Sequence, residues 1–453
     1  MPQTCVSIDL EMTSARPENQ EVIEIAAIKF RGERVVETWS TLIRPLSPVP
    51  YNVQVLTGID PRTLTRAPAL ADVADRLRTF VGDYPLVAHT VSADVGCLRR
   101  QGVALDNPQY DTFELASILL PQMSSYSLAS LAGQLGIEFP QQHRAAHDAL
   151  VTKQLFLKLI ELATELDLGL IQEINRLTQN HAWPLKTLFQ EIEAEKSKVA
   201  LGSSIRPAWA AKVGVDDTDL DLLVAPERAA ESVKPAKTLA PIDPKPLVAL
   251  LEPGGLLQQK LAGYEFREPQ VQMLRAVVTA LNEGQRLVVE AGTGTGKSLA
   301  YLVPAIYFAT KNGERVVVST NTINLQDQLI QKDLPDLQQV LPLPFRATVV
   351  KGRSNYLCLQ RLGTLRRRTD LSLSETLALI KVLVWLPTTV TGDQSELNLT
   401  DAERPVWSKL WAHPDICTPG TCRYARRGRC FLYRARSRAE ASHVVVVNHA
   451  LLL

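Results

Sequence analysis

Residues 290–298, E-A-G-T-G-T-G-K-S, constrain the fold of this chain more than any other stretch. An apolar run at 286–289 precedes them and a helical pattern follows from Leu299, which predicts the order strand, glycine-rich turn, helix. Glycines let backbone N–H groups approach phosphate oxygens without a Cβ between them, and the N-terminus of the following helix adds partial positive charge. The stretch therefore predicts a nucleotide site, and a plain glycine-rich turn is the weaker interpretation.

The expected role of each residue in this loop follows from its chemistry. Lys297 would reach the β- and γ-phosphates, and the Ser298 hydroxyl would hold Mg²⁺. Ala291 stands where the general pattern has its first glycine. The backbone contacts to phosphate would come from Gly292, Thr293, Gly294, Thr295 and Gly296.

Composition limits the class of protein. The 453 residues are 45% hydrophobic and 21% charged, as in an ordinary globular protein with about three domains. A formal net charge of +1 means that any nucleic-acid surface has to be a local patch. The N-terminus has no signal-peptide pattern and the chain has no apolar run of about 18 residues, so we expect a cytoplasmic protein without a membrane segment. Clustered cysteines in such a chain favour metal ligands over disulfides.

Carboxylates mark the first 165 residues. Residues 4–10 are predicted to form a strand, and Asp9 and Glu11, two positions apart, project from the same face of it. Paired acids on one face repel each other unless a cation lies between them, which suggests Mg²⁺ or Mn²⁺. Taken alone, D-x-E is also explained by a solvated strand end. Farther along, Asp94 follows the run L-V-A-H, and H-R-A-A-H-D at 143–148 opens a helical pattern.

With these motifs, residues 4–160 resemble the DnaQ-like 3′–5′ exonucleases, the DEDD group with a histidine in its third motif. The resemblance implies an α/β, RNase H-like domain at about 1–165, in which four carboxylates hold two metal ions and a histidine accepts the proton of the attacking water. It assigns these roles to Asp9, Glu11, Asp94, His143 and Asp148.

Some positions depart from that family's pattern. Met12, Thr90 and Ala93 stand where threonine, asparagine and phenylalanine are common. None of them is a metal ligand, so the departures concern the positioning of substrate. His147 competes with His143 for the proton-accepting role, but the family spacing favours His143, and His147 and His89 are expected at the surface or behind the site.

A connector follows the first domain. Residues 166–200 carry leucine and isoleucine at helical spacing, which predicts a helical extension. Residues 201–246 are rich in proline and include an acidic cluster from Asp216 to Asp221. Such a composition cannot bury enough apolar area to offset chain entropy, so we expect a linker, with the acids solvated.

The second half resembles superfamily 2 helicases of the DinG/XPD type. Besides the phosphate loop with its leading alanine, the resemblance rests on the stretches at 264–273, 316–329 and 347–358. It implies an incomplete RecA-like P-loop domain at 247–453 that binds ATP. By the same resemblance, Gln270 would contact adenine and the segment from Thr320 would contact the nucleic-acid backbone.

Four cysteines add to this resemblance. Cys417, Cys422 and Cys430 form C-x4-C-x7-C, and Cys358 lies well upstream. Four thiolates can ligate a [4Fe–4S] cluster or one Zn²⁺, and spacing alone does not separate the two. Their position, after G-R-S-N-Y-L and before V-V-V-V-N-H, resembles the iron–sulfur lobe of those helicases, which implies such a lobe at about 355–438.

Arginines and aromatic residues accumulate between residues 423 and 438 without an intervening acid. This combination suits phosphate contacts and base stacking on single strands, although a solvated helix face is the ordinary alternative. The expected nucleic-acid contacts are Arg423, Arg426, Arg427 and Arg434.

The helicase resemblance stops short of the D-E-x-H motif, which is not found after the phosphate loop. We therefore expect a truncated motor joined to a Mg²⁺-dependent 3′–5′ exonuclease, whose parent acts in DNA repair or replication on single-stranded or forked DNA, with RNA as the alternative. A second hypothesis is an exonuclease with an accessory DNA-binding region. A third is a non-catalytic nucleic-acid-binding or redox-sensing module. The residues do not indicate an oligomeric state.

Overall fold

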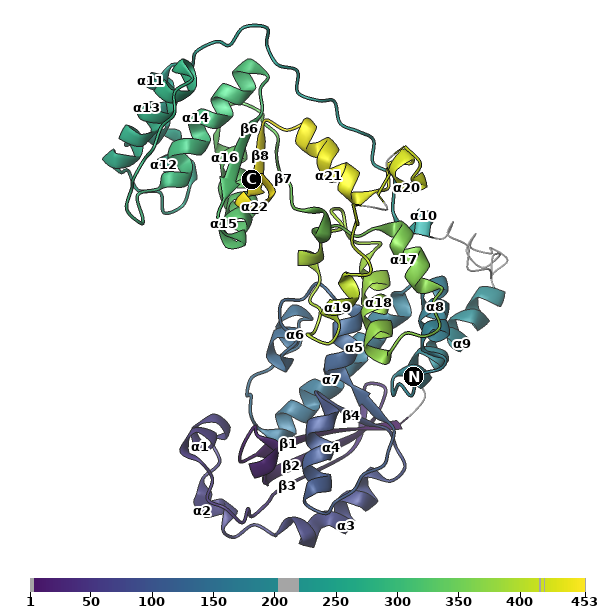
Figure 1. Ribbon diagram of the computed structural model, residues 1–453. Coiled ribbons are helices and arrows are strands. Elements are labelled where there is room, and N and C mark those ends of the chain that lie inside the picture. The colour runs from purple at the N-terminus through teal and green to yellow at the C-terminus, as the bar shows by residue number, and fades with distance from the viewer. Residues whose placement is uncertain (1–3, 203–219, 415–416, 419, 453) are drawn as a thin grey trace. The chain divides into compact units, whose positions relative to one another are not determined.

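The computed structural model describes residues 4–202, 220–414, 417–418 and 420–452 (Figure 1). Two compact units are present. The first comprises Met1–Asp216, Arg366–Thr389 and Ser395–Trp407, and the second comprises Asp217–Leu365, Val390–Gln394 and Ser408–Leu453. Within the described parts of the chain, no helix is both long and apolar enough to cross a bilayer.

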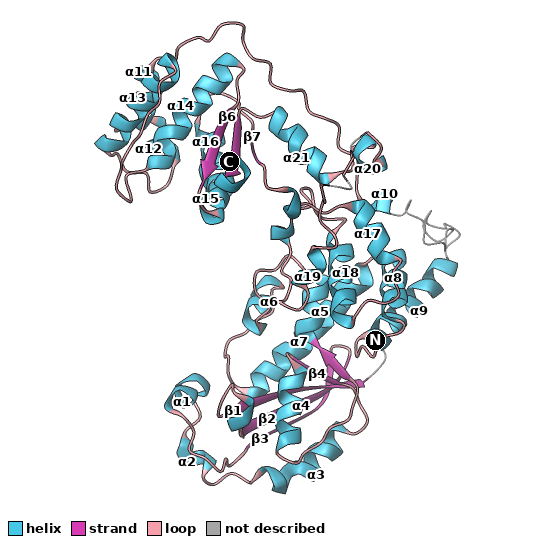
Figure 2. Ribbon diagram, in the orientation of Figure 1, coloured by secondary structure: helices cyan, strands magenta, loops and turns pink. Residues whose placement is uncertain are grey.

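A five-stranded sheet in the order β3-β2-β1-β4-β5 forms the centre of the first unit. The first three strands are antiparallel neighbours, and β4 and β5 continue the sheet in parallel with β1. Figure 2 shows these strands in magenta among the helices of the unit. Their bounds are β1 (Thr4–Met12), β2 (Val22–Arg31), β3 (Arg34–Leu42), β4 (Leu86–Ala88) and β5 (Gln109–Asp111).

The helix α7 (Ala145–Glu165) packs on β1 and β2. Small residues make this approach close, because Ala26 on β2 and Ala149 on α7 lie in one buried cluster. The buried Ser7 hydroxyl of β1 donates to the Ala149 carbonyl oxygen at 2.8 Å. The start of α7 is thereby fixed beside the end of β1.

Other helices of the N-terminal part lie around the sheet, and two of them, α8 and α9, extend the unit. The stretch at 166–200 contains α8 and α9, which pack on each other, and Trp183 between them stacks on Phe189 and donates to Glu114. The helices are α1 (Tyr51–Thr57), α2 (Pro61–Leu64), α3 (Leu70–Val81), α4 (Val91–Arg100), α5 (Thr112–Leu119), α6 (Leu128–Gln134), α8 (Leu168–Thr178) and α9 (Lys186–Gly202).

Two helices from the second half of the sequence complete the first unit. Helix α18 (Leu373–Trp385) packs against α5 and α8, and α19 (Arg404–Trp407) packs on α18. The Arg366 guanidinium bonds the Glu173 carboxylate of α8 at 2.8 Å. Residues 355–438, expected from sequence to form one lobe, are therefore divided between the two units.

A buried ion pair lies inside this inserted segment. Lys381 and Glu403 are 2% and 6% exposed, with Nζ and Oε1 2.7 Å apart. Removing one partner of such a pair leaves an unpaired charge in the protein interior. This lowers the free energy of unfolding far more than removing a partner of an exposed pair does. Lys158 and Glu161, which are about half exposed, form an exposed pair in the same unit.

We predict that Lys381→Ala destabilises the first unit by about 3–5 kcal/mol, whereas Lys158→Ala, which removes an exposed pair, leaves its stability nearly unchanged. The melting temperature and the hydrogen exchange of the β1 amides measure this in the full chain. The double change Lys381→Met with Glu403→Leu should recover most of the loss. Unchanged β1 exchange in Lys381→Ala would contradict the integral role of the inserted segment.

The second unit contains a parallel sheet in the order β6-β8-β7. Its central strand β8 (Val444–Asn448) carries four buried valines, as expected for a strand covered on both faces. Strands β6 (Val316–Thr320) and β7 (Ala347–Val349) flank it. The helices are α10 (Leu220–Leu223), α11 (Pro244–Leu251), α12 (Leu256–Lys260), α13 (Glu268–Glu283), α14 (Lys297–Asn312), α15 (Ile323–Gln328), α16 (Leu334–Val340), α17 (Leu359–Arg366), α20 (Arg423–Arg426), α21 (Phe431–Glu440) and α22 (His449–Leu452).

The predicted strand before the phosphate loop is wrong. Residues 286–289 have no regular secondary structure, and Val288 is 97% exposed. A strand needs a neighbour for its backbone hydrogen bonds, and in the described sheet both β6 and β7 pair with β8. An apolar run alone does not supply that neighbour.

The predicted linker is only partly testable, since residues 203–219, with Asp216, Asp217 and Asp219, lie outside the described residues. Residues 224–242, here called the strap, are not a free tether. They run extended between α10 and α11 (Figure 1) and bond the second unit repeatedly. The side chain of Asn312, fully buried on α14, accepts from the Ala240 amide at 2.7 Å and donates to its carbonyl. Buried amides thus hold a segment that itself buries little apolar area.

Candidate active site

The five residues predicted for the first unit converge at the end of β1. Asp9 and Glu11 come from β1, Asp94 from the first turn of α4, and Asp148 from the first turn of α7. Ligand atoms of Glu11, His143 and Asp148 all lie within 4.8 Å of one another. Elements that are distant in the sequence therefore bring one group of acids together.

Burial and mutual repulsion raise the pKa values of these carboxyls. Burial is the largest cause for Asp9, and the charge of Asp94 follows. The pKa of Glu11 rises to about 7, first through burial and then through the charges of Asp148 and Glu24. Burial also raises the pKa of Asp94 and that of Asp148. Keeping the cluster ionised at neutral pH requires a cation between the carboxylates.

The oxygen atoms present fit a divalent cation. Asp148 Oδ1 is buried and has no hydrogen-bond partner among the described residues. Carboxylate oxygens are the ligands that Mg²⁺ and Mn²⁺ prefer. The residues that could hold such ions are those that raise one another's pKa, namely Asp9, Glu11, Asp94 and Asp148.

Glu24 and Arg144 belong to this site and were missed from sequence. Glu24 faces Glu11 across the β1–β2 pair and is 4% exposed. Its carboxylate accepts from Arg144 Nη2 at 2.9 Å and from the Ala145 amide at 3.1 Å. This pair ties the start of α7 to β2 and so orients His143 and Asp148. An acid inside the apolar run V-I-E-I was the signal that could have revealed it.

Two residues near the acids have left-handed backbones. His143 has φ 61° and Thr90 has φ 73°, which is unfavourable for a β-branched residue. The Asp111 carboxylate accepts from the Thr90 and Val91 amides at 3.2 and 3.0 Å, and so holds the start of α4. The departure from asparagine at Thr90 therefore affects the turn that presents Asp94.

His89 and His147, the other two histidines considered from the sequence, are not in the acid cluster. Both ring nitrogens of His89 are engaged, with Nδ1 3.0 Å from the Thr112 hydroxyl and Nε2 2.9 Å from the Tyr126 carbonyl oxygen. Burial lowers the pKa of His89. His147 is exposed on α7. Neither occupies the position that His143 has beside Glu11 and Asp148.

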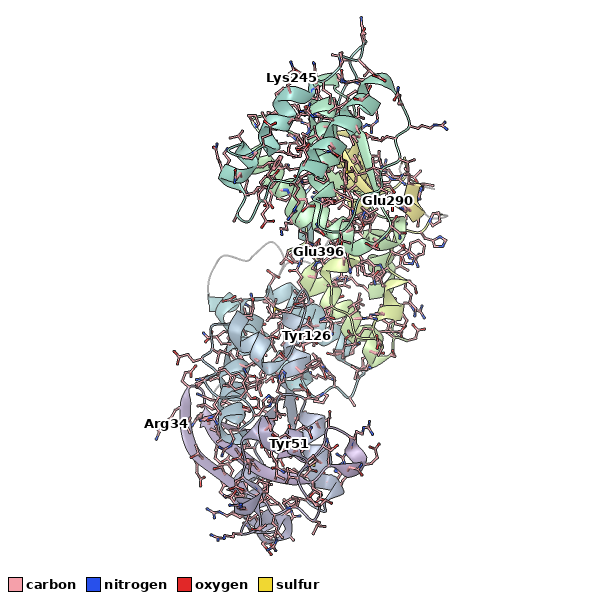
Figure 3. All side chains as sticks on the ribbon, turned by 90° about the vertical axis from the view of Figure 1, so that its left-hand side faces the viewer. Arg34, Tyr51, Tyr126, Lys245, Glu290 and Glu396 are labelled. Atoms are coloured by element: carbon pink, nitrogen blue, oxygen red, sulfur yellow. The ribbon has the colours of Figure 1, made fainter. Side chains whose placement is uncertain are left out.

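A cleft of about 860 Å³ adjoins Glu11. Its lining comes from the end of β1, the loop that follows it, and α1. Figure 3 labels Tyr51, the first residue of α1, which is 79% exposed. Leu56 on the same helix lines the cleft and is 53% exposed. An open cleft with apolar and polar walls beside the acids can receive the end of a polymer.

The phosphate loop of the second unit has the expected turn and helix. Gly294 and Gly296 have φ 81° and 75°, which a residue with a side chain rarely adopts, and α14 begins at Lys297. Lys297 Nζ donates to the carbonyl oxygens of Ala291 and Gly292 at 2.8 and 2.9 Å. The lysine thus lies inside the loop, where a phosphate would replace these carbonyl contacts.

Gln270 contacts the loop directly. Its side-chain amide donates to the Gly296 carbonyl at 2.8 Å, its oxygen lies 3.0 Å from the Tyr264 hydroxyl, and it is 2% exposed. A cleft of about 500 Å³ beside it is also lined by Ser298 and Asp333. The predicted adenine contact of Gln270 stays a prediction, but the residue does line this cleft.

The four cysteines of the second half lie near one another. All are free and partly buried. The pKa of Cys430 is raised to about 11, mainly by burial and also by the charges of Cys417, Cys358 and Cys422. Among the described residues, only the group of Glu11, His143 and Asp148 has three ligand atoms within 4.8 Å of one another, so the cysteines do not form a closed metal site here.

The predicted nucleic-acid contacts differ in exposure. Arg426 and Arg427 are exposed, and Arg423 lies 4.7 Å over the Tyr424 ring. Arg434 is 8% exposed and is engaged by the strap, and Thr320 is 2% exposed with its hydroxyl bonded to the Thr322 carbonyl. The last two are not surface contacts in this conformation, because neighbouring backbone already uses their polar groups.

Comparisons with known proteins agree with both halves of the site description. Residues 6–156 match the Exonuclease family model, and residues 270–389 match the DEAD/DEAH box helicase model. The chain is 30% identical to the 3′–5′ exonuclease DinG of Bacillus subtilis (strain 168), over 100% of the chain and 47% of that protein. The chain is homologous to the DinG 3′–5′ exonucleases along its entire length. The predicted resemblance to an exonuclease–helicase fusion is thereby confirmed.

The DinG relatives are longer than this chain. The 3′–5′ exonuclease DinG of Staphylococcus aureus (strain MRSA252) is 26% identical over 99% of the chain and 48% of the relative. The chain thus spans about half the length of the curated relatives it matches. Among solved structures, Exonuclease X in complex with 5′ overhanging duplex DNA is 25% identical, with a TM-score of 0.30 over 35% of this chain and 91% of that one. The nuclease domain of 3′hExo, a DEDDh family member bound to rAMP, is 16% identical, with a TM-score of 0.32 over 35% and 92%.

The raised pKa of Glu11 predicts how stability depends on pH and metal. Between pH 4.5 and about 7 the folded protein keeps a proton that the unfolded chain has released. The retained proton stabilises the folded protein by on the order of 3 kcal/mol. This stabilisation is fully present below pH 4.5 and is lost as the pH rises to about 7. In chelator, the melting temperature should fall over this interval, and Mg²⁺ should raise it more at pH 7.5 than at pH 5.

Glu11→Gln is the control for this measurement. Because its amide does not titrate, the variant should show a flatter pH dependence and a smaller Mg²⁺ effect. The interpretation of the acid cluster fails if Mg²⁺ stabilises Glu11→Gln and the unchanged protein equally at pH 7.5.

Proposed function

We propose that the first unit is an exonuclease that uses Mg²⁺ or Mn²⁺ to remove nucleotides from the 3′ end of a nucleic acid. The observation that carries this is the convergence of one histidine and four carboxyls, two of them buried and two partly buried, at the end of β1. A buried group of acids with an unpaired oxygen is costly unless cations neutralise it. The arrangement therefore suits metal-assisted phosphodiester hydrolysis.

The chain's own residues would divide the work as follows. Asp9, Glu11, Asp94 and Asp148 would hold two divalent ions, which when bound supply an activated water and stabilise the leaving 3′ oxygen. His143, which lies beside Glu11 and Asp148, would accept the proton that this water gives up. The Glu24–Arg144 ion pair fixes the backbone that presents His143.

The cleft beside Glu11 is the proposed binding site for the 3′ end of the nucleic acid. Leu56 of α1 lines this cleft with apolar surface, and Tyr51 at the start of the same helix is an exposed ring on which a base can stack. Single-stranded or forked DNA is the proposed substrate, with RNA as the alternative. The setting we propose is DNA repair or replication in the cytoplasm.

For the second unit we propose ATP binding as part of a DinG-type helicase motor. Support comes from the left-handed glycines of the loop, the start of α14 at Lys297, and the adjoining cleft lined by Gln270 and Ser298. The Ser298 hydroxyl would hold Mg²⁺ and Lys297 would contact the terminal phosphates. Arg423, Arg426 and Arg427 would contact the nucleic-acid backbone.

A [4Fe–4S] cluster is the proposed occupant of the cysteine group. Support comes from the partial burial of Cys358, Cys417, Cys422 and Cys430 and from the effect of their charges on one another. Anaerobically purified protein should contain about four iron atoms and no zinc, as measured by metal analysis. Cys417→Ser should lose the iron, and Cys97→Ser, which changes a buried cysteine of the first unit, should retain it. One zinc and no iron per chain would replace the proposal with a zinc site.

Digestion of a 5′-labelled single strand tests the exonuclease. With Mg²⁺, the full chain should shorten the strand from its 3′ end, and Asp9→Asn should reduce the rate by at least about a hundredfold. Replacing Asp9 relieves repulsion in the buried cluster, so lost activity would not reflect unfolding. Asp75→Ala, at an exposed position on α3, should digest normally. Equal rates in Asp9→Asn and the unchanged protein would overturn the proposal.

A further inference from the structure

The strap supplies oxygen acceptors to a row of arginines. Arg429 Nε donates to the Val224 carbonyl oxygen at 2.8 Å, and Arg434 donates to the carbonyl oxygen of Ala225. Arg438 binds the Glu227 carboxylate through two nitrogens, with Nε and Oε1 2.8 Å apart. Three strap residues, Val224, Ala225 and Glu227, thus supply acceptors to three guanidinium groups of the α20–α21 region.

These contacts are of the kind that a nucleic-acid strand would make with arginines. An extended chain that presents a series of oxygens, the Glu227 carboxylate among them, offers a row of guanidinium groups what a phosphodiester backbone offers. Aromatic rings lie among these arginines, with Arg434 5.2 Å over Phe431 and Arg436 5.6 Å over Tyr433. A cleft of about 410 Å³ lies between the strap and α21, lined by Tyr433 and Arg436.

We propose that residues 225–233 cover a single-strand-binding groove on α20–α21, and that a phosphodiester strand displaces them to reach Arg434 and Arg438. This rests on the nucleic-acid function proposed above. It accounts for the burial of Arg434, since the groove is occupied by the chain's own acceptors. Arg426 and Arg427, which are already exposed, would make the first contact.

The strap is held differently along its length. Beyond residue 235, neutral bonds to the helices fix it: the Ala236 amide donates to the Asn312 carbonyl at 2.8 Å, and the Asn282 side chain bonds both backbone groups of Ile242. At the other end, Val224 is 3% exposed and packs into the unit. Between these anchors lie the Glu227 ion pairs, which a competing anion weakens. The middle can therefore lift while both ends stay attached.

Backbone hydrogen bonds also join the strap to the α20–α21 region. The Glu227 amide donates to the Gly428 carbonyl at 2.9 Å, and the Val233 amide to the Glu440 carbonyl at 3.0 Å. Gly428 has φ 65°, and a Cβ there would collide with the Glu227 carbonyl oxygen. Glycine at this position lets the strap lie directly on the turn between α20 and α21.

Binding of labelled oligonucleotides tests the proposal. In full-length Asp9→Asn protein, which should not digest the probe, Glu227→Gln should bind oligo-dT about fivefold more tightly, the size that a partly exposed ion pair supports. Glu231→Gln is the matched control, because Glu231 makes the same charge change on the strap but pairs with Lys234. Oligo-U in parallel shows whether DNA or RNA gains more.

The outcomes separate the two proposals. If Asp9→Asn protein binds neither oligonucleotide, the proposed nucleic-acid function itself fails. If it binds but Glu227→Gln gains no more affinity than Glu231→Gln, or loses affinity, the strap proposal is overturned and the proposed function stands.

Hydrogen exchange gives a second test that changes no strap residue. Adding oligo-dT to the Asp9→Asn protein should accelerate exchange of the Glu227 and Val233 amides, because both lose their carbonyl partners. The Ala236 and Ala240 amides, beyond the displaced stretch, should exchange as before. Unchanged or slower exchange at Glu227 and Val233 in the presence of bound oligonucleotide would overturn the proposal.

Discussion

The close approach of α7 to β1 and β2 is the constraint on which the first unit depends. Alanines at positions 26, 145 and 149 remove the side chains that would keep helix and sheet apart, and Ser7 closes the contact with a hydrogen bond. The same approach that buries the core also brings Asp148 against Glu11 and Asp9. Packing energy thus holds together carboxylates that repel one another, and the Glu24–Arg144 pair ties the start of α7 to β2.

The candidate site could be predicted from the sequence because its residues lie in short patterns. Alternation on a strand put Asp9 and Glu11 on one face, and the family spacing singled out His143 over His147. Glu24 was missed because its role depends on an antiparallel register and on Arg144, about 120 residues away. Sequence periodicity carries no information about such a pairing.

The second half shows where local patterns mislead. The apolar run at 286–289 has the composition of a strand, but the described sheet gives it no neighbour. Composition also predicted a free linker at 201–246, although the buried Asn312 of α14 bonds Ala240 and Asn282 of α13 bonds Ile242. The arginine run likewise had no balancing acids nearby in sequence, and the structure supplies one from Glu227, about 200 residues earlier. In each case the deciding partner is remote in the chain.

The first unit is discontinuous in sequence, and this has a consequence for how the protein is made. Helices α18 and α19 pack on α5 and α8, and Arg366 binds Glu173. A ribosome adds residues at about 5–20 per second, so the β1 sheet exists for some ten seconds or more before α18 and α19 emerge. During that time the faces of α5 and α8 that α18 covers stay open to water. Completion of the N-terminal unit therefore waits for the synthesis of a segment that lies beyond the phosphate loop.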